Sequence, residues 1–304
     1  MRTYGKDSET LNAVYVTDDR GRLIDDVRMR EILLAPLRNE IESLMDRNFI
    51  ALHVDDPQSK AVELFRRYDR TALPVVSGDD ALVGIVTVDD ILDVVEEEAT
   101  REMQKFGGLE ALDEPYAATP LLELVRKRGM WLILLFVGET FTAVAMQHYE
   151  HEIDLAPILA LFLPLIISSG GNSGSQAATL LVRALALGEV KLKEWRQVLG
   201  RELLSGFLLG LVLGSIGFCR IALWHAMFGM YNPHWLPVAF TVGVSLIGVV
   251  MWGTLSGAML PFLLKRLGFD PASSSAPLVA TMVDVTGLII YFSVAMLFLR
   301  GTLL

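Results

Sequence analysis

The chain has 304 residues, of which 52% are hydrophobic, a formal net charge of −10 and a single cysteine, Cys219. One cysteine excludes an intramolecular disulfide framework, and the acidic balance argues against binding of nucleic acid, which requires basic surfaces. The charge is unevenly distributed, because residues 1–128 contain 27 of the 36 acidic and 17 of the 26 basic residues. We therefore expect an acidic soluble region, which suits cations, followed by a neutral membrane region.

The first 94 residues contain a repeat. A β-rich run, a polar turn, a second run and a helix occur twice, about 60 residues apart. Residues 23–33 align with residues 82–92, and a helix is expected between the copies at residues 57–68. The pattern resembles a tandem CBS domain pair whose first copy lacks its leading helix and strand. The polar N-terminal segment does not have the pattern of a signal peptide.

The second copy carries the sequence GIVTVDD, from Gly84 to Asp90. This segment resembles the nucleotide-facing signature of CBS domains, which implies that the Thr87 hydroxyl suits a phosphate and Asp90 a ribose. The first copy has Asp25 instead of the glycine and Arg28 instead of the threonine, so the resemblance gives no support for a first nucleotide site. A CBS pair that binds no nucleotide is an equally good interpretation.

An acidic helix is expected at residues 91–108, where apolar residues recur at helical spacing and Gly107-Gly108 ends the pattern. A charge run on a helix is usually a solvated face. Acids this dense nevertheless repel one another, and a divalent ion between two acidic surfaces would relieve the repulsion. A linker containing Pro115 and Pro120 leads to the basic cluster Arg126-Lys127-Arg128.

Five apolar spans follow, each long enough to cross a hydrocarbon core of roughly 30 Å. They cover residues 129–147, 157–187, 203–224, 237–264 and 276–299. Lys and Arg residues precede the first span and follow the second and fourth, whereas the other two loops have neither. The positive-inside rule therefore predicts a cytoplasmic N-terminal region and an outside C-terminus.

Polar and small residues interrupt the second span from Ser168 to Gln176. They predict either a tight helix–helix seam built on glycines or one wall of a polar pathway. Asp284, inside the fifth span, favours the pathway, because an intramembrane carboxylate is a functional site by default. Glu139, in the first span, either lines a vestibule or bonds to a neighbouring helix.

The acidic helix together with GGNSGSQAATLLVRALA and DPASSSAPLVATMVDVTGLIIYF resembles the MgtE family of magnesium transporters and channels. The resemblance implies a homodimer with five membrane helices per subunit and one pore on the dimer axis. It also implies that a cytosolic assembly closes the pore when internal magnesium is high. In this family an N domain precedes the CBS pair, and the chain is expected to start too late to contain it.

The resemblance also implies roles for individual residues. Asp284 matches the pore aspartate, Ala280 a small residue of the pore wall, and Ala276 a position where the family has Asn. Asp270 and Glu202 match acids near the cytoplasmic pore entrance. The matching ion-sensing acids are Asp90, Asp93, Glu98 and Glu102, and Arg101 replaces a further one. The other residues expected to line the pore are Gly170, Gly171, Asn172, Gly174, Gln176 and Thr281.

We therefore expect a multi-domain protein, with an α/β CBS pair at residues 1–94 whose first copy is incomplete. An acidic connecting helix and linker at 95–128 would lead to an all-α membrane domain of five transmembrane helices at 129–304. The expected function is Mg²⁺ influx across the prokaryotic plasma membrane by a homodimer that cytosolic Mg²⁺ closes. Mg²⁺ is expected as both the transported and the regulatory ion, and the partner of the membrane helices is the lipid bilayer. ATP is the ligand only under the interpretation in which the CBS pair binds a nucleotide.

Two alternatives to Mg²⁺ transport differ from it in substrate or in functional class. One is a broader divalent-cation transporter that also passes manganese, cobalt or nickel, which the missing Asn at Ala276 favours. The other is a membrane sensor that transports nothing, against which Asp284 and a second helix broken by its polar stretch both argue. No metalloprotease, paired-aspartate or nucleophile motif occurs in the spans, so an enzyme is not expected.

Overall fold

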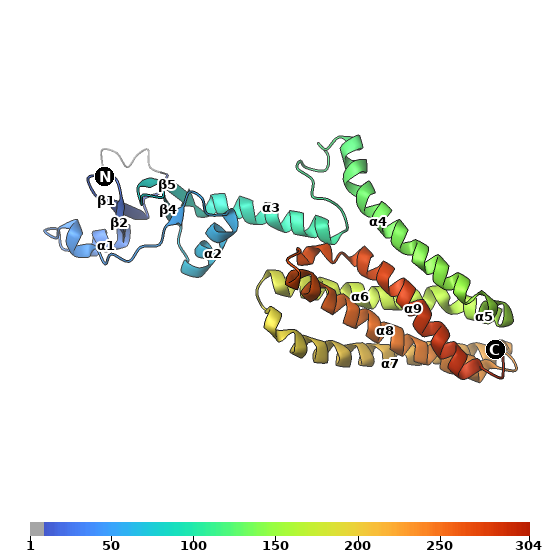
Figure 1. Cartoon of the computed structure of the whole chain (residues 1–304). Coiled ribbons are helices and arrows are strands. Elements are labelled where there is room, and N and C mark those ends of the chain that lie inside the picture. Colours follow the sequence, from blue (N-terminus) through green and yellow to red (C-terminus); the bar gives the residue numbers. More distant parts are fainter. Residues whose placement is uncertain (1–8) are drawn as a thin grey trace. The chain divides into compact units, whose positions relative to one another are not determined.

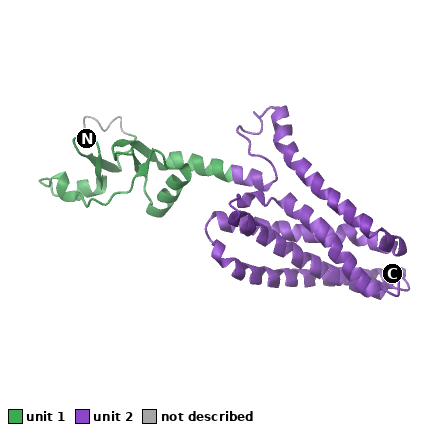
Figure 2. Ribbon diagram, in the orientation of Figure 1, with its two compact units in different colours: residues 1–100 green, residues 101–304 purple. Residues whose placement is uncertain are grey.

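The structure of the chain is a computed structural model that describes residues 9–304. The polar N-terminal segment, residues 1–8, which begins the predicted CBS region, lies outside the described residues. The chain divides into two compact units at residues 100 and 101 (Figure 2). The boundary falls inside one long helix, α3 (Val88–Phe106), so this helix belongs partly to each unit (Figures 1 and 2).

The first unit has the predicted repeat of strand, turn, strand and helix. Two strands form an antiparallel hairpin in the first copy, and three form a mixed sheet of order β3-β4-β5 in the second. Among the described residues only the second copy has a leading strand and helix, as expected. The elements are β1 (Ala13–Thr17), β2 (Leu23–Arg28), α1 (Met29–Leu34), the 3-10 helix η2 (Ile41–Leu44), β3 (Leu52–His53), α2 (Gln58–Tyr68), β4 (Ala72–Val76), β5 (Leu82–Thr87) and the start of α3.

The two copies are joined through their turns. The amide of Leu23 donates to the carbonyl of Asp80, and the amide of Leu82 donates to the carbonyl of Gly21, both at 2.9 Å. These reciprocal bonds connect the equivalent ends of the two hairpins. The second copy has its own small core, in which Phe65 of α2 packs on strand and α3 residues.

The second unit consists of helices and contains the five spans that the sequence predicts. The helices that contain the first and third spans start about eight residues before these spans, because helical backbone hydrogen bonding extends into the preceding polar residues. The elements are α4 (Leu121–His148), α5 (Glu150–Leu155), η3 (Pro157–Phe162), α6 (Leu163–Ala186), η4 (Leu192–Glu194), α7 (Trp195–Phe228), α8 (Trp235–Arg266), η5 (Pro271–Ser273) and α9 (Ala276–Leu299).

Helix α8 lies at the centre of this unit and packs against α6, α7 and α9. Its apolar partners form the main core, where the hydroxyl of Tyr291 donates to the carbonyl of Leu159 at 2.9 Å. Helix α4 is different: it packs mainly along α9 and stands at an angle to the other long helices (Figure 1). Its most apolar stretch has no buried residue, so lipid or another chain must cover that surface.

A seam of glycines brings α6 and α8 into backbone contact. A Cβ atom added to Gly253 would collide with the carbonyl oxygen of Gly170, and one added to Gly257 would collide with that of Gly174. Small residues four apart on both helices allow this approach, which is the usual way that membrane helices associate closely. The seam interpretation of the polar stretch is therefore correct for Gly170 and Gly174.

The expectation that the polar stretch breaks the second helix is wrong. Helix α6 is continuous from Leu163 to Ala186. Two of its hydroxyls bond to the helix's own carbonyls, Ser169 to Leu165 at 2.6 Å and Thr179 to Ser175 at 2.7 Å. Glycine and serine weaken a helix in water, but in a membrane the backbone has no other partner, so the helix is retained.

The seam makes a direct stability prediction. Gly257→Ala should destabilise the protein by about 1–3 kcal/mol, because its methyl group meets a rigid carbonyl on α6. The midpoint of thermal unfolding in detergent, followed by helical circular dichroism, measures the effect. Gly200→Ala is the matched control, since a Cβ at Gly200 has nothing within 4 Å. Equal midpoints for the two variants would contradict the close approach.

Candidate functional site

One face of α9 carries the predicted pore residues. Ala276, Ala280 and Asp284 are four residues apart, so they lie one above another along the helix. All three are half-buried, whereas Val279 and Val283 are fully buried. The acid is thus placed at the edge of the helix bundle and not in its packed centre.

Helix α6 approaches this face through Gly171. A Cβ atom at Gly171 would lie 3.5 Å from the Cβ of Ala280 and 3.9 Å from an oxygen of Asp284. These are ordinary contact distances, so no side chain stands between the α6 backbone and the Asp284 carboxyl. Gly171 therefore differs from Gly170 and Gly174, which are used in the seam with α8.

Helix α4 brings a second acid to the same place. Gly138 allows α4 to approach α9, since a Cβ there would lie 2.7 Å from Cγ2 of Thr281. The next residue on α4, Glu139, interacts electrostatically with Asp284. Glu139 therefore lies beside a neighbouring helix, and both roles that the sequence left open for it stay predictions. That neighbour carries the candidate pore acid.

The two carboxyl groups lack a compensating positive charge. Glu139 is the one charged group of the described chain that acts on Asp284. Among residues 9–304, no three His, Cys, Asp or Glu side chains are grouped so that they could hold a metal ion. Two acids offer at most four oxygens, whereas Mg²⁺ takes six ligands. Water or a second chain would have to supply the rest.

The remaining polar residues of α6 lie in several environments. Asn172 and Gln176 are exposed, and the Asn172 amide donates to the hydroxyl of Ser168 at 3.4 Å. Ser173 instead forms a buried hydrogen bond with Thr254 of α8, at 2.6 Å. The structure thus divides the predicted pore-lining set: Gly171 and Thr281 lie near Asp284, whereas Asn172 and Gln176 face outward from the single chain.

The predicted acids of the pore entrance lie on separate elements. Asp270, in the connection between α8 and α9, accepts from the amide of Ala272 at 2.9 Å and from Lys105 at the end of α3 at 2.8 Å. Burial raises the pKa of Asp270, but the bonds from Lys105 and Ala272 outweigh it, so its pKa is lowered. Glu202 lies on α7, 3.5 Å from the hydroxyl of Ser205. The carboxylate of Asp270 is therefore already paired with a cation of the chain itself.

The predicted nucleotide residues bond to each other. The amide and hydroxyl of Thr87 donate to Asp90 at 3.0 and 2.8 Å, where α3 begins. The backbone bond and then the hydroxyl bond lower the pKa of Asp90. This is a helix-capping arrangement, so both side chains have a structural role without a nucleotide. In the first copy, the buried Asp25 accepts from the amide of Arg47 at 3.0 Å, which also has a structural role.

The other predicted sensing acids are on the surface of α3. Asp93, Glu98 and Glu102 are exposed, and they are spread over about half of the helix circumference. The helix thus presents acids in several directions, as expected for either a solvated helix or one that faces more than one acidic surface.

Comparison with known proteins matches both parts of this architecture. Residues 163–294 match the MgtE family, described as divalent cation transporters, and residues 41–97 match the CBS domain. The magnesium transporter MgtE of Thermus thermophilus is 41% identical over 301 residues, which cover 99% of this chain and 65% of that protein. The chain belongs to the MgtE family. It is a multi-pass membrane protein of a transporter family and not an enzyme.

Two further MgtE proteins are similar to this chain. The magnesium transporter MgtE of Enterococcus faecalis is 34% identical over 96% of this chain and 62% of its own length. The chain thus spans slightly less than two thirds of the relatives it matches. The solved cytosolic domain of the Mg²⁺ channel MgtE in complex with ATP is 39% identical, covers 31% of this chain and 38% of its own, and has a TM-score of 0.30.

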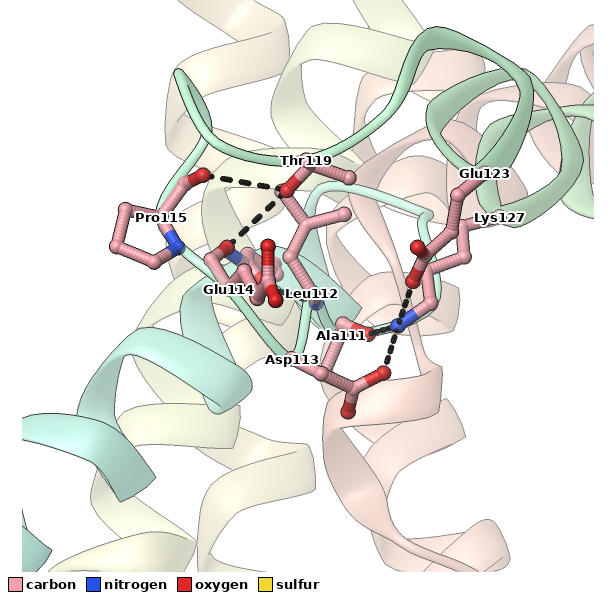
Figure 3. Close-up of polar contacts among 9 residues, drawn as sticks. Ala111, Leu112, Asp113, Glu114, Pro115, Thr119, Glu123 and Lys127 are labelled. Atoms are coloured by element: carbon pink, nitrogen blue, oxygen red, sulfur yellow. Dashed lines mark hydrogen bonds and ion pairs between the residues drawn. The ribbon is translucent and has the colours of Figure 1, made fainter.

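The linker of this MgtE-family chain is held by a buried lysine (Figure 3). Lys127 of α4 donates to the carbonyl of Ala111 and to the carboxylate of Asp113, both at 2.6 Å, and lies 3.4 Å from Glu123. The hydrogen bond from Lys127 lowers the pKa of Asp113. The linker is also tied to α3, because the Gln104 side chain accepts from the amide of Leu112 at 2.8 Å.

Sequence reasoning did not identify the roles of Lys127 and Lys105. Lys127 was visible only as one member of a basic cluster, and Lys105 as a basic residue in the last turn of an acidic helix. Their partners lie 14 and 165 residues away, so no spacing rule connects them. An acid within the linker and a basic residue at the start of the first span were the available signals.

Removing the Lys127 amine should loosen the linker. Lys127→Gln leaves the Ala111 carbonyl and Asp113 with a weaker partner, at a cost of about 1–3 kcal/mol. Amide exchange of residues 109–119 should then rise roughly tenfold to a hundredfold. Arg126→Gln is the control, because Arg126 is an exposed neighbour of the same charge. Unchanged exchange in Lys127→Gln would show that the lysine does not hold this segment.

Proposed function

We propose that the chain mediates Mg²⁺ movement across the plasma membrane, and that Asp284 binds the ion in the pathway. The observation that carries the proposal is the close approach of α4 to α9 at Gly138, which brings two interacting acids, Asp284 and Glu139, together within apolar membrane helices of an MgtE-family chain. Two uncompensated carboxylates repel in a low dielectric, and a divalent cation balances them both. The relatives named as magnesium transporters support Mg²⁺ as the ion.

The ion would pass with much of its water shell. Mg²⁺ loses water reluctantly, so a site for it has to offer oxygens to a largely hydrated ion. The Gly171 backbone approaches Asp284 without an intervening side chain, which leaves room for such a shell. Asn172 and Gln176, which are exposed in one chain, would be used where a second chain completes the pathway.

A homodimer with the pathway on its axis completes the site. Within residues 9–304, one chain supplies two acids and no group of three His, Cys, Asp or Glu side chains. A two-fold axis beside α9 would double Asp284 and would bring two copies of its face together. The exposed apolar surface of α4 and the half-buried face of α9 are available for such contacts. The N-terminal unit would lie in the cytoplasm, on the side where the basic residues gather.

Ala276 bears on the choice between divalent ions. It lies two turns before Asp284 and offers no side-chain oxygen or amide, and its carbonyl already accepts from Ser175 at 3.2 Å. Fewer fixed polar groups at the pathway favour weaker discrimination among hydrated ions. This observation supports a second candidate function, a broader divalent-cation transporter that also passes manganese, cobalt or nickel.

Flux into vesicles tests the proposal. Asp284→Asn keeps the size of the side chain and removes its charge, so Mg²⁺ uptake by the reconstituted full chain should fall by at least about tenfold. Glu139→Gln should lower uptake less, since one carboxylate remains. Ser293→Ala, on the same helix, is the control, because the Ser293 hydroxyl bonds only to its own helix. Repeating the assay with Mn²⁺ and Co²⁺ separates the two candidate functions, and wild-type flux in Asp284→Asn would refute both.

Cytosolic Mg²⁺ would close the pathway by binding the acids of α3. Ions between α3 and other acidic surfaces stabilise one arrangement of the cytosolic unit, and a ligand shifts such an equilibrium by its differential affinity. Arg101 lowers the negative charge of α3, so inhibition should be weak. ATP at Thr87 and Asp90 would require these side chains to exchange their mutual bond for the nucleotide.

Charge changes on α3 should move the inhibition midpoint. Glu98→Gln with Glu102→Gln should raise the internal Mg²⁺ concentration needed for inhibition, and Arg101→Glu should lower it, each by roughly threefold to tenfold. Patch currents at varied internal Mg²⁺ measure the midpoint. Glu40→Gln with Glu42→Gln removes the same charge from the exposed η2 segment and serves as the control. A shift of equal size in the control would point to bulk surface charge.

A further inference from the structure

A cavity of about 520 Å³ lies where α7 begins and α8 ends. It is separate from the Asp284 site, because its walls come from η4, the first residue of α7 and the last two turns of α8. The lining combines apolar side chains with two basic ones. The residues that matter here are Lys193, Trp195, Met259, Phe262, Leu263 and Arg266.

The cavity lies at the polar ends of two candidate membrane helices. Trp195 is the first residue of α7, before the apolar run of the third span, and Arg266 is the last residue of α8, just after the apolar run of the fourth. Tryptophan and basic residues are typical of such helix ends. Lys265, next to Arg266, donates to the carbonyl of Leu185 at 3.2 Å and fixes the end of α8 against the end of α6.

The charge of the cavity is uncompensated. No acid lines it. Within the part of the chain that the structure describes, neither Lys193 nor Arg266 forms an ion pair. The adjacent acid, Glu194, is already used, because it accepts from the amide of Lys191 at 2.7 Å. Two cations thus face a space that opens at headgroup level.

We propose that this cavity binds one anionic phospholipid, with its headgroup phosphate between Lys193 and Arg266. An acyl chain would lie along Met259, Phe262 and Leu263, which the cavity exposes beside the charges. Basic pockets between membrane helices are the type of site that recognises anionic lipid headgroups. The occupant is a lipid and not a free anion because apolar residues and two cations line the same cavity, at the ends of candidate membrane helices. The proposal requires only that the helices span a bilayer, and it does not depend on ion transport.

The expected preference follows from the number of cations. Each basic residue near an anionic lipid contributes about fivefold in affinity, so two give a roughly 30-fold preference over a zwitterionic lipid. Removing one cation should leave a preference of about fivefold. The apolar wall contributes equally to both lipids and does not change the ratio.

Fluorescence quenching measures this preference. The full chain is reconstituted in phosphatidylcholine vesicles with increasing fractions of brominated phosphatidylglycerol or brominated phosphatidylcholine. The Trp195 signal is the difference between the wild type and Trp195→Phe. Half-maximal quenching should need a roughly 30-fold smaller fraction of the anionic lipid. Lys193→Gln with Arg266→Gln should abolish the preference, and Lys193→Gln alone should give the intermediate value. Lys191→Gln with Arg201→Gln, which removes the same charge from residues outside the cavity, should retain it.

Three results would overturn the proposal. Equal quenching by the two lipids would show an apolar crevice without headgroup recognition. A preference removed by excess inorganic phosphate at constant ionic strength would show a site for a free anion. Quenching by neither lipid would mean that another surface, such as a second copy of the chain, covers Trp195. None of these outcomes involves Mg²⁺ flux, so they are independent of the proposed function.

Discussion

Backbone contact between α6 and α8 is the constraint on which the membrane unit depends. Gly170 and Gly174 meet Gly253 and Gly257 so closely that a single methyl group would separate the helices. Once α6 is fixed against α8, its next face is turned toward α9, and Gly171 reaches Asp284. Dispersion over a close seam replaces the hydrophobic driving force, which is weak between helices in lipid. The position of the candidate site thus follows from residues that have no polar side chain.

The site itself is electrostatically incomplete in one chain. Asp284 lies on the last of the five membrane helices and Glu139 on the first. Their approach requires the small residue Gly138 on α4. The buried Lys127, by comparison, is paired with Asp113 of the same chain. Within residues 9–304 neither of the two acids forms an ion pair with a cation. The cost of unpaired charge in a membrane therefore favours an external cation as their partner.

The sequence predicted the larger features well. Hydropathy located the five spans, and the repeat located both hairpins, because each depends on a local periodicity. The sequence did not show which role the polar stretch of α6 has, since glycines are typical of both a helix–helix seam and a polar pathway. In the structure Gly170 belongs to the seam with α8, whereas Gly171 lies beside Asp284. Glu139 and Lys127 were visible, but their partners were not, because side-chain contacts between distant helices leave no spacing pattern.

Two lysines connect the end of α3 to the helices that hold the acid pair. Lys105 of α3 bonds to Asp270, which lies just before α9 and therefore before Asp284. Lys127 holds the linker against α4, which is the helix that carries Glu139. The linker is in turn hydrogen-bonded to α3 through the amide of Leu112. A displacement of the α3 end would consequently act on α4 and α9 at once. Asp284 and Glu139 belong to these two helices, so both helices that carry the acid pair are connected through hydrogen bonds to the end of α3.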